Sequence, residues 1–334
     1  MLKSVTEFRF IWDGKPFTVG VSIGIASIHD RDQRPQDVMS AADMACYMAK
    51  ELGRNRIHLY TADDLDLARR HGEMQWVSRI KRALEEESFF LECQPIIPLG
   101  DEERPSLRWE MLIRLREEEK VILPGAFIGS AERYGLMPDI DRWVIDTAIE
   151  LLSTFYHTGQ LEPGKLVFFI NISGCTISEK SLFKHIKKQL AHHHVPPQAV
   201  CFEITETAAI SNLTDAVEFM GQLRELGCAV ALDDFGAGLC SFTYLKSIPA
   251  DYLKIDGSFI QHMLEQPMDA AIVEVIKYIG DAASLKTIAE FVTSDKIRIE
   301  LEAIGINYAQ GFGIERPGPL HKMISKVHAD KLSD

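Results

Sequence analysis

Residues 228–238, CAVALDDFGAG, join an apolar run to two consecutive aspartates and a glycine-rich turn. The first five residues carry no charge, as expected of a strand that is buried on both faces of a parallel sheet. Asp233 and Asp234 stand where this strand ends, and Gly236 and Gly238 allow the following backbone to turn sharply. The stretch therefore predicts a buried parallel strand that carries two carboxylates at its carboxyl end.

The same arrangement recurs from Phe89 onward, where apolar strand-like segments alternate with segments of helical periodicity. About eight alternations in roughly 240 residues predict an α/β fold, a closed TIM-like (β/α)8 barrel over residues 88–325. A doubly wound open sheet competes with it, but the glycine-rich phosphate turn which that fold needs is missing from the sequence. The predicted strands are 89–96, 106–114, 166–172, 200–204, 228–233, 251–255, 286–290 and 306–309. The predicted helices are 124–134, 138–159, 178–193, 212–226, 240–247, 258–262, 267–282 and 293–304.

Residues 1–60 predict a small α+β unit ahead of the barrel. Residues 16–26 alternate like one strand or two short ones, and residues 35–56 have the apolar spacing of a helix that Gly53 closes. Residues 61–87 form a charged segment with one apolar stripe, which predicts a connecting helix.

Composition restricts the possible partners and compartment. The 334 residues carry a formal net charge of −13, so we expect no DNA or RNA duplex as a partner. The apolar runs are too short to span a bilayer, and no signal peptide opens the chain. The six cysteines form no CxxC pair and suit a reducing compartment. We expect a cytoplasmic fragment without membrane contact, whose parent protein can be anchored through upstream segments.

Polar side chains stand at or near the carboxyl ends of seven predicted strands. In a barrel these ends converge on one face, where active sites are built. A lone acid after a strand is often a helix cap, but several buried carboxylates facing one another repel and are costly to desolvate. A divalent cation resolves that cost, because hard cations take oxygen ligands from Asp, Glu and Asn. The residues are Glu110, Arg114, Asn171, Glu203, Glu206, Asp233, Asp234, Lys254, Asp256, Glu290 and Gln310.

This set suits the hydrolysis of a phosphodiester by two metal ions, which activate water and stabilise the leaving oxygen. Paired carboxylates would also suit a glycosidase, and a barrel acting on another phosphoester or a sugar phosphate remains an alternative. Asn171 and Lys254 beside the aspartate doublet favour metal ions. Asp234 and the two residues after it match a kinase magnesium motif, but no other kinase motif accompanies them.

The ordered segments around these residues resemble the EAL-domain family over about residues 75–322. The resemblance rests on Gln94-Pro95-Ile96, Glu110-Met111-Leu112 with Arg114, Pro124 to Ile128, Asn171, Glu203 to Glu206, Asp233 to Gly238, Leu253 to Asp256, Ala289-Glu290 and Gln310-Gly311-Phe312. It implies a TIM-like barrel that hydrolyses cyclic di-GMP to linear pGpG. It also implies two Mg²⁺ or Mn²⁺ ions as cofactors and inhibition by Ca²⁺.

The resemblance also implies roles for individual residues. Two ions would be held by Glu110, Asn171, Glu203, Asp233, Asp234 and Glu290. Catalytic roles would fall to Lys254, which would position the attacking water, to Glu290 as a candidate base beside that water, and to Glu110. Glu206 would brace the loop after Asp234. Contacts to the substrate would come from Gln94, Leu112, Arg114, Asp141 and Gln310, with Arg114 at a phosphate and Asp141 at a guanine edge.

Three sites depart from the family pattern. Met111 replaces the alanine of the name motif, and its side chain is expected to point away from the metals. Ala237 replaces a threonine in the loop after the doublet. Phe291 and Thr293 replace the glycine and the second glutamate of an AEGVE pattern, which is expected to tilt the loop and lower the rate. A non-catalytic cyclic-di-GMP receptor is the alternative function, although receptors of this family usually lack several of the metal-site residues present here.

The front of the chain resembles the C-terminal part of a GGDEF domain, through residues 21–26, Ala42-Asp43 and residues 47–56. The GG[DE]EF signature is missing from all 334 residues, so we expect no synthesis of cyclic di-GMP. We expect a fragment of a longer tandem protein that begins inside its GGDEF domain. The resemblance further predicts a homodimer that pairs near the loop after Asp234.

Overall fold

The computed structural model describes residues 2–6, 8–12, 15–18, 20–28, 34–100, 107–157, 166–237, 244–320 and 322. The chain divides into two compact units, Met1–Arg79 and Ile80–Asp334. Helix α3, Ala62–Glu85, contains the boundary between them. Among the described residues, no helix has both the length and the hydropathy needed to cross a membrane.

The first unit is built around one helix and a short parallel strand pair. Helix α2, Pro35–Glu51, packs on β3, and a Cβ atom at Gly24 of this strand would lie 2.2 Å from the backbone of the helix. Only glycine allows so close an approach. The other elements are α1 (Leu2–Thr6), the antiparallel pair β1 (Arg9–Trp12) and β2 (Lys15–Thr18), and β4 (Ile57–Leu59), which runs parallel to β3 (Ile23–Ile25).

The second unit is the predicted α/β barrel, and its eight described barrel strands close on themselves. The sheet order is β5-β13-β12-β11-β10-β9-β8-β6, and β5 pairs with β6 to complete the ring. The strands are β5 (Phe89–Pro98), β6 (Leu107–Glu117), β8 (Leu166–Asn171), β9 (Val200–Thr205), β10 (Ala229–Phe235), β11 (Tyr252–Ile255), β12 (Lys286–Ala289) and β13 (Tyr308–Ala309).

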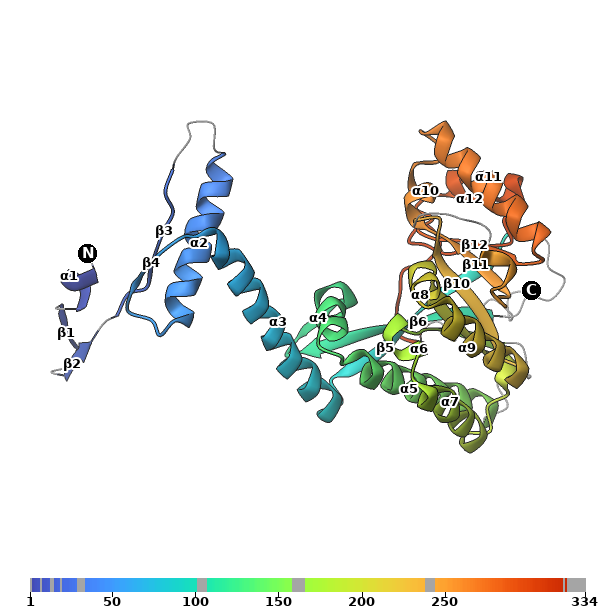
Figure 1. The fold of residues 1–334 in the computed structure, drawn as a ribbon, viewed down its shortest axis with the longest axis horizontal. Helices are drawn as coiled ribbons and strands as arrows, with labels where there is room; N and C mark the ends of the chain where they lie inside the picture. The colour runs from blue at the N-terminus through green and yellow to red at the C-terminus, as the bar shows by residue number, and fades with distance from the viewer. Residues whose placement is uncertain are drawn as a thin grey trace. The chain divides into compact units, whose positions relative to one another are not determined.

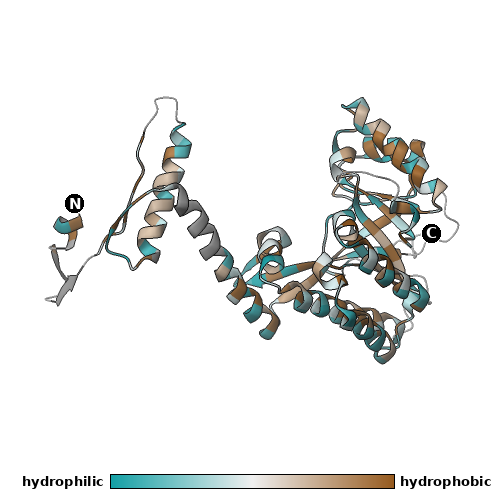
Figure 2. Ribbon diagram, in the orientation of Figure 1, coloured by the Kyte–Doolittle hydropathy of each residue, from teal (hydrophilic) through white to brown (hydrophobic). Residues whose placement is uncertain are grey.

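Helices flank the strands of the barrel unit (Figure 1). The barrel strands carry mostly hydrophobic residues, and the flanking helices carry both hydrophilic and hydrophobic residues (Figure 2). The long helices are α5 (Met137–His157), α7 (Lys180–His192), α9 (Leu213–Leu226), α11 (Pro267–Ala282) and α12 (Asp295–Ile304). The short ones are η1 (Pro124–Ala126), α4 (Ile128–Arg133), α6 (Gly174–Ile177), η2 (Pro197–Ala199), α8 (Glu206–Ser211), η3 (Tyr244–Lys246) and α10 (Gly257–His262). Of the predicted helix 240–247, the described part is only η3, and residues 240–243 lie outside the described ranges.

The barrel differs from a set of eight parallel strands at its first strand. Strand β5 runs antiparallel to both of its neighbours, β6 and β13. Strand β6 is longer than predicted, because it continues into a hairpin with β7, Lys120–Ile122, which the sequence did not predict. Glu110 is therefore in the first half of its strand, and the expectation that it stands near the carboxyl end was wrong. It still pairs with Phe169 near the end of β8, so it lies at the level where the shorter strands finish.

The barrel interior contains an apolar layer, and the side chains that follow it along the strands are polar. Side chains two residues apart in a strand point to the same face. Moving two residues from Phe169, Cys201 or Ala231 along its strand therefore reaches a polar residue on the same inward face. The apolar layer consists of Ile96, Val167, Phe169, Cys201, Ala231, Ile288 and Tyr308. The polar residues two positions away are Gln94, Asn171, Glu203, Asp233, Glu290 and Gln310.

Candidate active site

Lys254 occupies the centre of the polar end of the barrel. It is fully buried on β11, and among the described residues four carboxylates surround its Nζ atom. The nearest oxygens belong to Glu203 at 2.8 Å, Glu290 at 2.8 Å, Asp233 at 3.0 Å and Glu110 at 3.7 Å. A single ammonium thus faces more negative charge than it can balance.

The pKa values reflect this imbalance. Burial raises the pKa of Glu203 well above its usual value, and the nearby Glu110 raises it further. Burial also raises the pKa of Glu290 to about 8, against the lowering effect of Lys254. The pKa of Lys254 is itself well above its ordinary value, because the carboxylates outweigh a burial effect that acts in the opposite direction. Without a further cation, the ammonium stays protonated while some carboxyls hold protons.

The donor set fits divalent cations. Both carboxylate oxygens of Glu203 and Oδ1 of Asp233 are buried and accept no hydrogen bond of regular geometry from any described residue, although the Lys254 ammonium is close. Oxygens of Asp233, Asp234 and Glu290 lie within 4.8 Å of one another. Buried carboxylate oxygens without regular donors are costly unless a cation is present, and hard cations prefer such ligands. The chemistry of these residues therefore fits a divalent cation.

A bulge explains how two consecutive aspartates can serve one site. Along β10 and β11, Leu232 pairs with Leu253 but Phe235 pairs with Ile255, so the segment of β10 holds one extra residue. Asp234 adopts a left-handed backbone with φ of +53°. A bulge of this kind breaks strand alternation and redirects a side chain. Burial and the neighbouring Asp233 raise the pKa of Asp234 to about 6, which shows that the two carboxyls interact.

Two amide side chains hold Glu110, and a third amide contacts one of them. It accepts hydrogen bonds from Asn171 Nδ2 at 2.8 Å and from Gln310 Nε2 at 2.6 Å. Gln310 Nε2 also reaches Gln94 Oε1 at 3.0 Å, and Gln94 Nε2 donates to the carbonyl of Glu315 at 2.8 Å. Together with Lys254, the amides lower the pKa of Glu110 in spite of its burial. The amides keep this carboxylate charged and oriented.

Glu206 connects the end of β9 to the loop after the aspartate doublet. Its Oε2 accepts the backbone N–H of Gly236 at 2.9 Å, and its Oε1 accepts the hydroxyl of Tyr244. Glu206 is buried, and Gly236 has a φ of +99°. No signal in the sequence pointed to Tyr244. The loop between these contacts, residues 238–243, lies outside the described residues.

The predicted substrate contacts on β6 lie on the same face as Glu110. Leu112 is half-buried two residues beyond it, and Arg114 follows two residues later. Arg114 Nε donates to Glu92 Oε2 at 2.8 Å, and its Nη1 donates to the carbonyl of Ile113 at 2.9 Å. The sequence did not indicate Glu92 as a partner of this arginine. Met111 is buried between the two inward residues of its strand.

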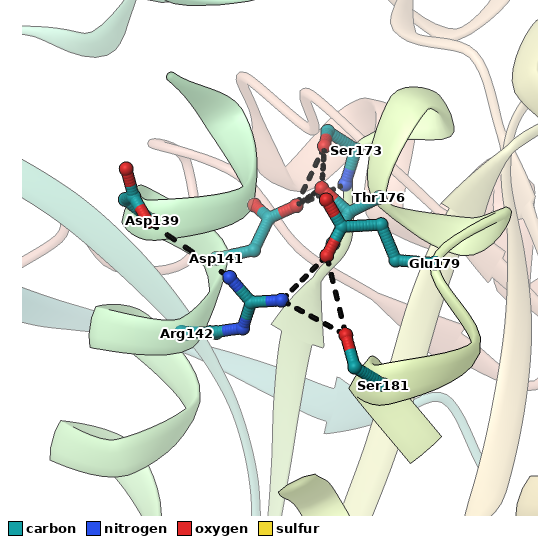
Figure 3. Close-up of polar contacts among 7 residues, drawn as sticks. All are labelled: Asp139, Asp141, Arg142, Ser173, Thr176, Glu179 and Ser181. Carbon is teal, nitrogen blue, oxygen red and sulfur yellow. Dashed lines mark hydrogen bonds and ion pairs between the residues drawn. The ribbon is translucent and has the colours of Figure 1, made fainter. Parts of the chain in front are cut away.

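Asp141 on α5 accepts hydrogen bonds from the segment that follows Asn171 (Figure 3). Its Oδ2 accepts the backbone N–H of Ser173 at 3.1 Å, the hydroxyl of Ser173 at 2.6 Å and the hydroxyl of Thr176 at 2.6 Å. Beside it, Arg142 donates to Glu179 at 2.5 Å. Burial raises the pKa of Asp141 against these hydrogen bonds. No signal in the sequence indicated that Ser173 and Thr176 would be the partners of Asp141.

The loop after Glu290 carries the departures from the family pattern. Phe291 has a φ of +51° and Thr293 is exposed. For a residue with a Cβ atom, this backbone costs on the order of 1–2 kcal/mol. Glu290 Oε1 nevertheless lies 2.8 Å from the Lys254 ammonium. The substitutions therefore leave this carboxylate within the acidic cluster.

Comparison with known proteins agrees with this geometry. The model of the EAL domain matches residues 77–317, and that of the diguanylate cyclase GGDEF domain matches residues 2–56. The chain is 41% identical over 305 residues to cyclic di-GMP phosphodiesterase PdeB of Shewanella oneidensis, covering 91% of this chain and 35% of that protein. It is 29% identical to cyclic di-GMP phosphodiesterase PdeF of Escherichia coli, covering 96% of this chain and 42% of that protein. The chain thus spans less than half the length of these two relatives.

Two solved structures also align with this chain over most of their own length. The PaMucR phosphodiesterase in complex with c-di-GMP aligns with a TM-score of 0.69 at 30% identity, covering 75% of this chain and 99% of that one. The EAL domain of Xanthomonas citri FimX in complex with c-di-GMP aligns with a TM-score of 0.69 at 27% identity, covering 76% and 97% of the two chains.

Proposed function

Because the chain belongs to the EAL-domain family, we propose that its barrel hydrolyses cyclic di-GMP to linear pGpG with two divalent cations. The observation that carries the proposal is the cluster of buried carboxylates around Lys254, with oxygens that no regular hydrogen bond satisfies. A receptor that only held the nucleotide would have no use for such a costly arrangement. The relatives named as phosphodiesterases and the neighbour bound to c-di-GMP support this substrate.

The ions would be held by the six oxygen ligands of the polar layer. Asn171 donates its amide to Glu110, which suits a side chain whose carbonyl oxygen serves as a ligand. When bound, two Mg²⁺ or Mn²⁺ ions supply charge neutralisation at the phosphate and lower the pKa of water. We expect Ca²⁺ to bind with looser geometry and to inhibit. The ligands are Glu110, Asn171, Glu203, Asp233, Asp234 and Glu290.

Lys254 and Glu290 would position the attacking water and accept its proton, respectively. The carboxylates around Lys254 raise its pKa in the metal-free protein, and as an ammonium it would donate a hydrogen bond to the water. Glu290 contacts the same ammonium, so its carboxylate would lie beside the water that Lys254 holds, where it would accept a proton. Gln310 orients Glu110, and Glu206 braces the loop after Asp234.

Substrate contacts would come from Gln94, Leu112, Arg114, Asp141 and Gln310. Arg114 would exchange part of its contact with Glu92 for a phosphate oxygen, since both partners are anionic. For Asp141 to read a guanine edge, the carboxylate would have to do so beside its three contacts to Ser173 and Thr176.

The test is turnover of cyclic di-GMP with Mg²⁺ or Mn²⁺, following the appearance of pGpG, with a chelator as control. We expect metal-dependent hydrolysis, and we expect Glu110→Ala to abolish it while leaving nucleotide binding measurable. A folded protein that binds cyclic di-GMP but shows no metal-dependent turnover would instead establish the receptor function.

Two further expectations accompany this function. We propose a homodimer that pairs near the loop after Asp234, and light scattering that shows only monomer would contradict it. We also propose that the protein works in the cytoplasm, because the described cysteines are all free thiols. Alkylation of the isolated, unreduced protein should modify all six cysteines after unfolding, and disulfide-linked species would argue against this compartment.

A further inference from the structure

Glu92 places a carboxylate among the proposed substrate contacts on β5 and β6. In the antiparallel register of these strands, Glu92 lies directly opposite Leu112, and Gln94 lies opposite Glu110. Paired residues of an antiparallel sheet point to the same face, so Glu92 shares the inward face of the two strands. Gln94 is two residues away on its own strand, and Arg114 is diagonally across from it. A carboxylate therefore lies where an anionic nucleotide would bind.

The chain itself holds the guanidinium of Arg114 at two of its nitrogens. Nε donates to Glu92 Oε2 at 2.8 Å, and Nη1 donates to the carbonyl of Ile113 at 2.9 Å. The side chain of Arg114 is 8% exposed and that of Glu92 is 22% exposed, so solvent screens this ion pair less than it screens a surface pair. Because a guanidinium has five N–H donors, the remaining ones can still meet a second anion.

A phosphate of the substrate would compete with Glu92 for this guanidinium. Carboxylate and phosphate both accept the charge-assisted hydrogen bonds that an arginine donates. The nucleotide has to displace the carboxylate from Nε or bind beside it, and in both cases the negative charge of Glu92 opposes the incoming anion. A binding group that is already occupied in the free protein lowers the apparent affinity for its ligand.

We propose that Glu92 is an internal competitor of the substrate phosphate for Arg114, and that it sets the affinity of the site for the nucleotide. The inference rests on the proposed function, which assigns Arg114 to a phosphate. Glu92 acts through this arginine and not on the reacting bond, so it is a positioning residue. The same competition favours release of pGpG, because the linear product is also an anion.

The test compares Glu92→Gln with the parent in the full chain. The amide oxygen of glutamine can still accept the N–H of Arg114 Nε, but it carries no charge. Binding of cyclic di-GMP is measured by titration calorimetry with Ca²⁺, and turnover is measured with Mn²⁺. Both Kd and KM should fall about fivefold at unchanged kcat, because the substitution strengthens the binding of substrate and transition state alike.

Salt dependence and stability separate this competition from a structural role. The variant leaves the charge of Arg114 uncompensated, so its Kd should rise more steeply with salt than that of the parent. Its Tm should decrease, because a charge-assisted hydrogen bond becomes a neutral one. A substitution that only disturbed the strand pair would weaken stability and binding together, whereas competition predicts lower stability with tighter binding.

Asp251→Asn is the matched control. It neutralises the carboxylate of another ion pair of the barrel, in which Asp251 Oδ1 lies 3.2 Å from Arg224 Nη2. Asp251 directly precedes β11, at the end of this strand remote from Lys254. The Kd of this variant for cyclic di-GMP should equal that of the parent.

An unchanged or raised Kd in Glu92→Gln would overturn the competition. An equal fall in Kd for Asp251→Asn would also overturn it, because the net charge of the protein would then explain the effect. A parent protein that binds cyclic di-GMP without cleaving it would overturn the proposed hydrolysis alone, because the ratio of Kd values with Ca²⁺ would still decide the role of Glu92. A parent that does not bind the nucleotide would overturn both.

Discussion

The two inward layers of the barrel are only two residues apart along each strand, yet they differ in polarity and in how well the chain itself satisfies their side chains. The layer around Phe169, Ala231 and Ile288 is apolar and satisfied by contacts within the chain. The layer around Glu203, Asp233 and Glu290 leaves oxygens without regular donors and raises the pKa values of two of its carboxyls. The first layer is satisfied by contacts within the chain, whereas the second has buried oxygens whose chemistry fits a divalent cation. The apolar layer therefore stabilises the barrel, and the polar layer contains the candidate active site.

The largest effect should come from removing the buried ammonium. Lys254→Met leaves four carboxylates facing one another without a cation, and breaking a buried ion pair from one side costs about 3–5 kcal/mol. We expect the free energy of unfolding of the metal-free protein to fall by about that amount, and Mg²⁺ to restore part of it. Denaturant unfolding followed by Trp109 and Trp143 measures both.

Ile288→Val is the matched control in the apolar layer. It should cost about 0.5–1.5 kcal/mol, with the same value in the presence and absence of Mg²⁺. The contrast between the layers fails if the two substitutions respond equally to the cation.

The pH dependence of the metal-free protein should also differ from that of the loaded one. Glu290 has a pKa of about 8 in the folded state and an ordinary value of 4.5, and Asp234 has about 6 against 3.8. Between these limits the folded state binds more protons than the unfolded state, so stability decreases as the pH rises from about 4.5 to 8. Thermal unfolding at fixed ionic strength should show a falling Tm without metal. A Tm that rises over this range would contradict the raised pKa values.

A smaller effect is expected from the brace behind the aspartate doublet. Glu206→Gln weakens the acceptor of the Gly236 N–H and of the Tyr244 hydroxyl, and loss of such supporting contacts typically lowers metal affinity 10–100-fold. We expect about tenfold weaker Mn²⁺ binding by titration calorimetry. Tyr244→Phe removes one of the two contacts and should produce a smaller loss. Unchanged affinity in both would show that the doublet does not depend on this brace.

The smallest effect concerns the support of the loop after Asn171. Thr176→Val removes one of the hydrogen bonds to Asp141 and should lower the free energy of unfolding by about 1 kcal/mol without changing KM. Asp141→Asn should raise KM for cyclic di-GMP if the carboxylate also reads guanine. Equal KM in both variants would assign Asp141 to loop support alone.

The sequence was sufficient to predict the barrel and the composition of its polar layer. Apolar strands that end in acids, such as the run before Asp233, follow from burial on both faces. The EAL resemblance and the fold were both confirmed. The antiparallel direction of β5 was not predictable, because alternation of side chains is the same in both strand directions.

The contacts between residues distant in sequence were not predictable either. Glu92 and Tyr244 sit in segments without a distinctive pattern, and only the folded chain brings them to Arg114 and Glu206. The bulge at the aspartate doublet was not predictable either, because one extra residue in a strand does not change the composition of the segment. Local patterns therefore predicted the elements, and tertiary placement decided which polar residues meet.

The reversed first strand also determines where the polypeptide enters the barrel. In a barrel of eight parallel strands, the chain arrives at the end remote from the active site. Here β5 runs the other way, so Phe89 pairs with Leu115, beyond the level of Glu110, and Gln94 pairs with Glu110 itself. Helix α3 therefore delivers the chain to the rim that carries the acids. The covalent path from the preceding sequence to the centre of the site is only a few residues of one hydrogen-bonded strand pair long.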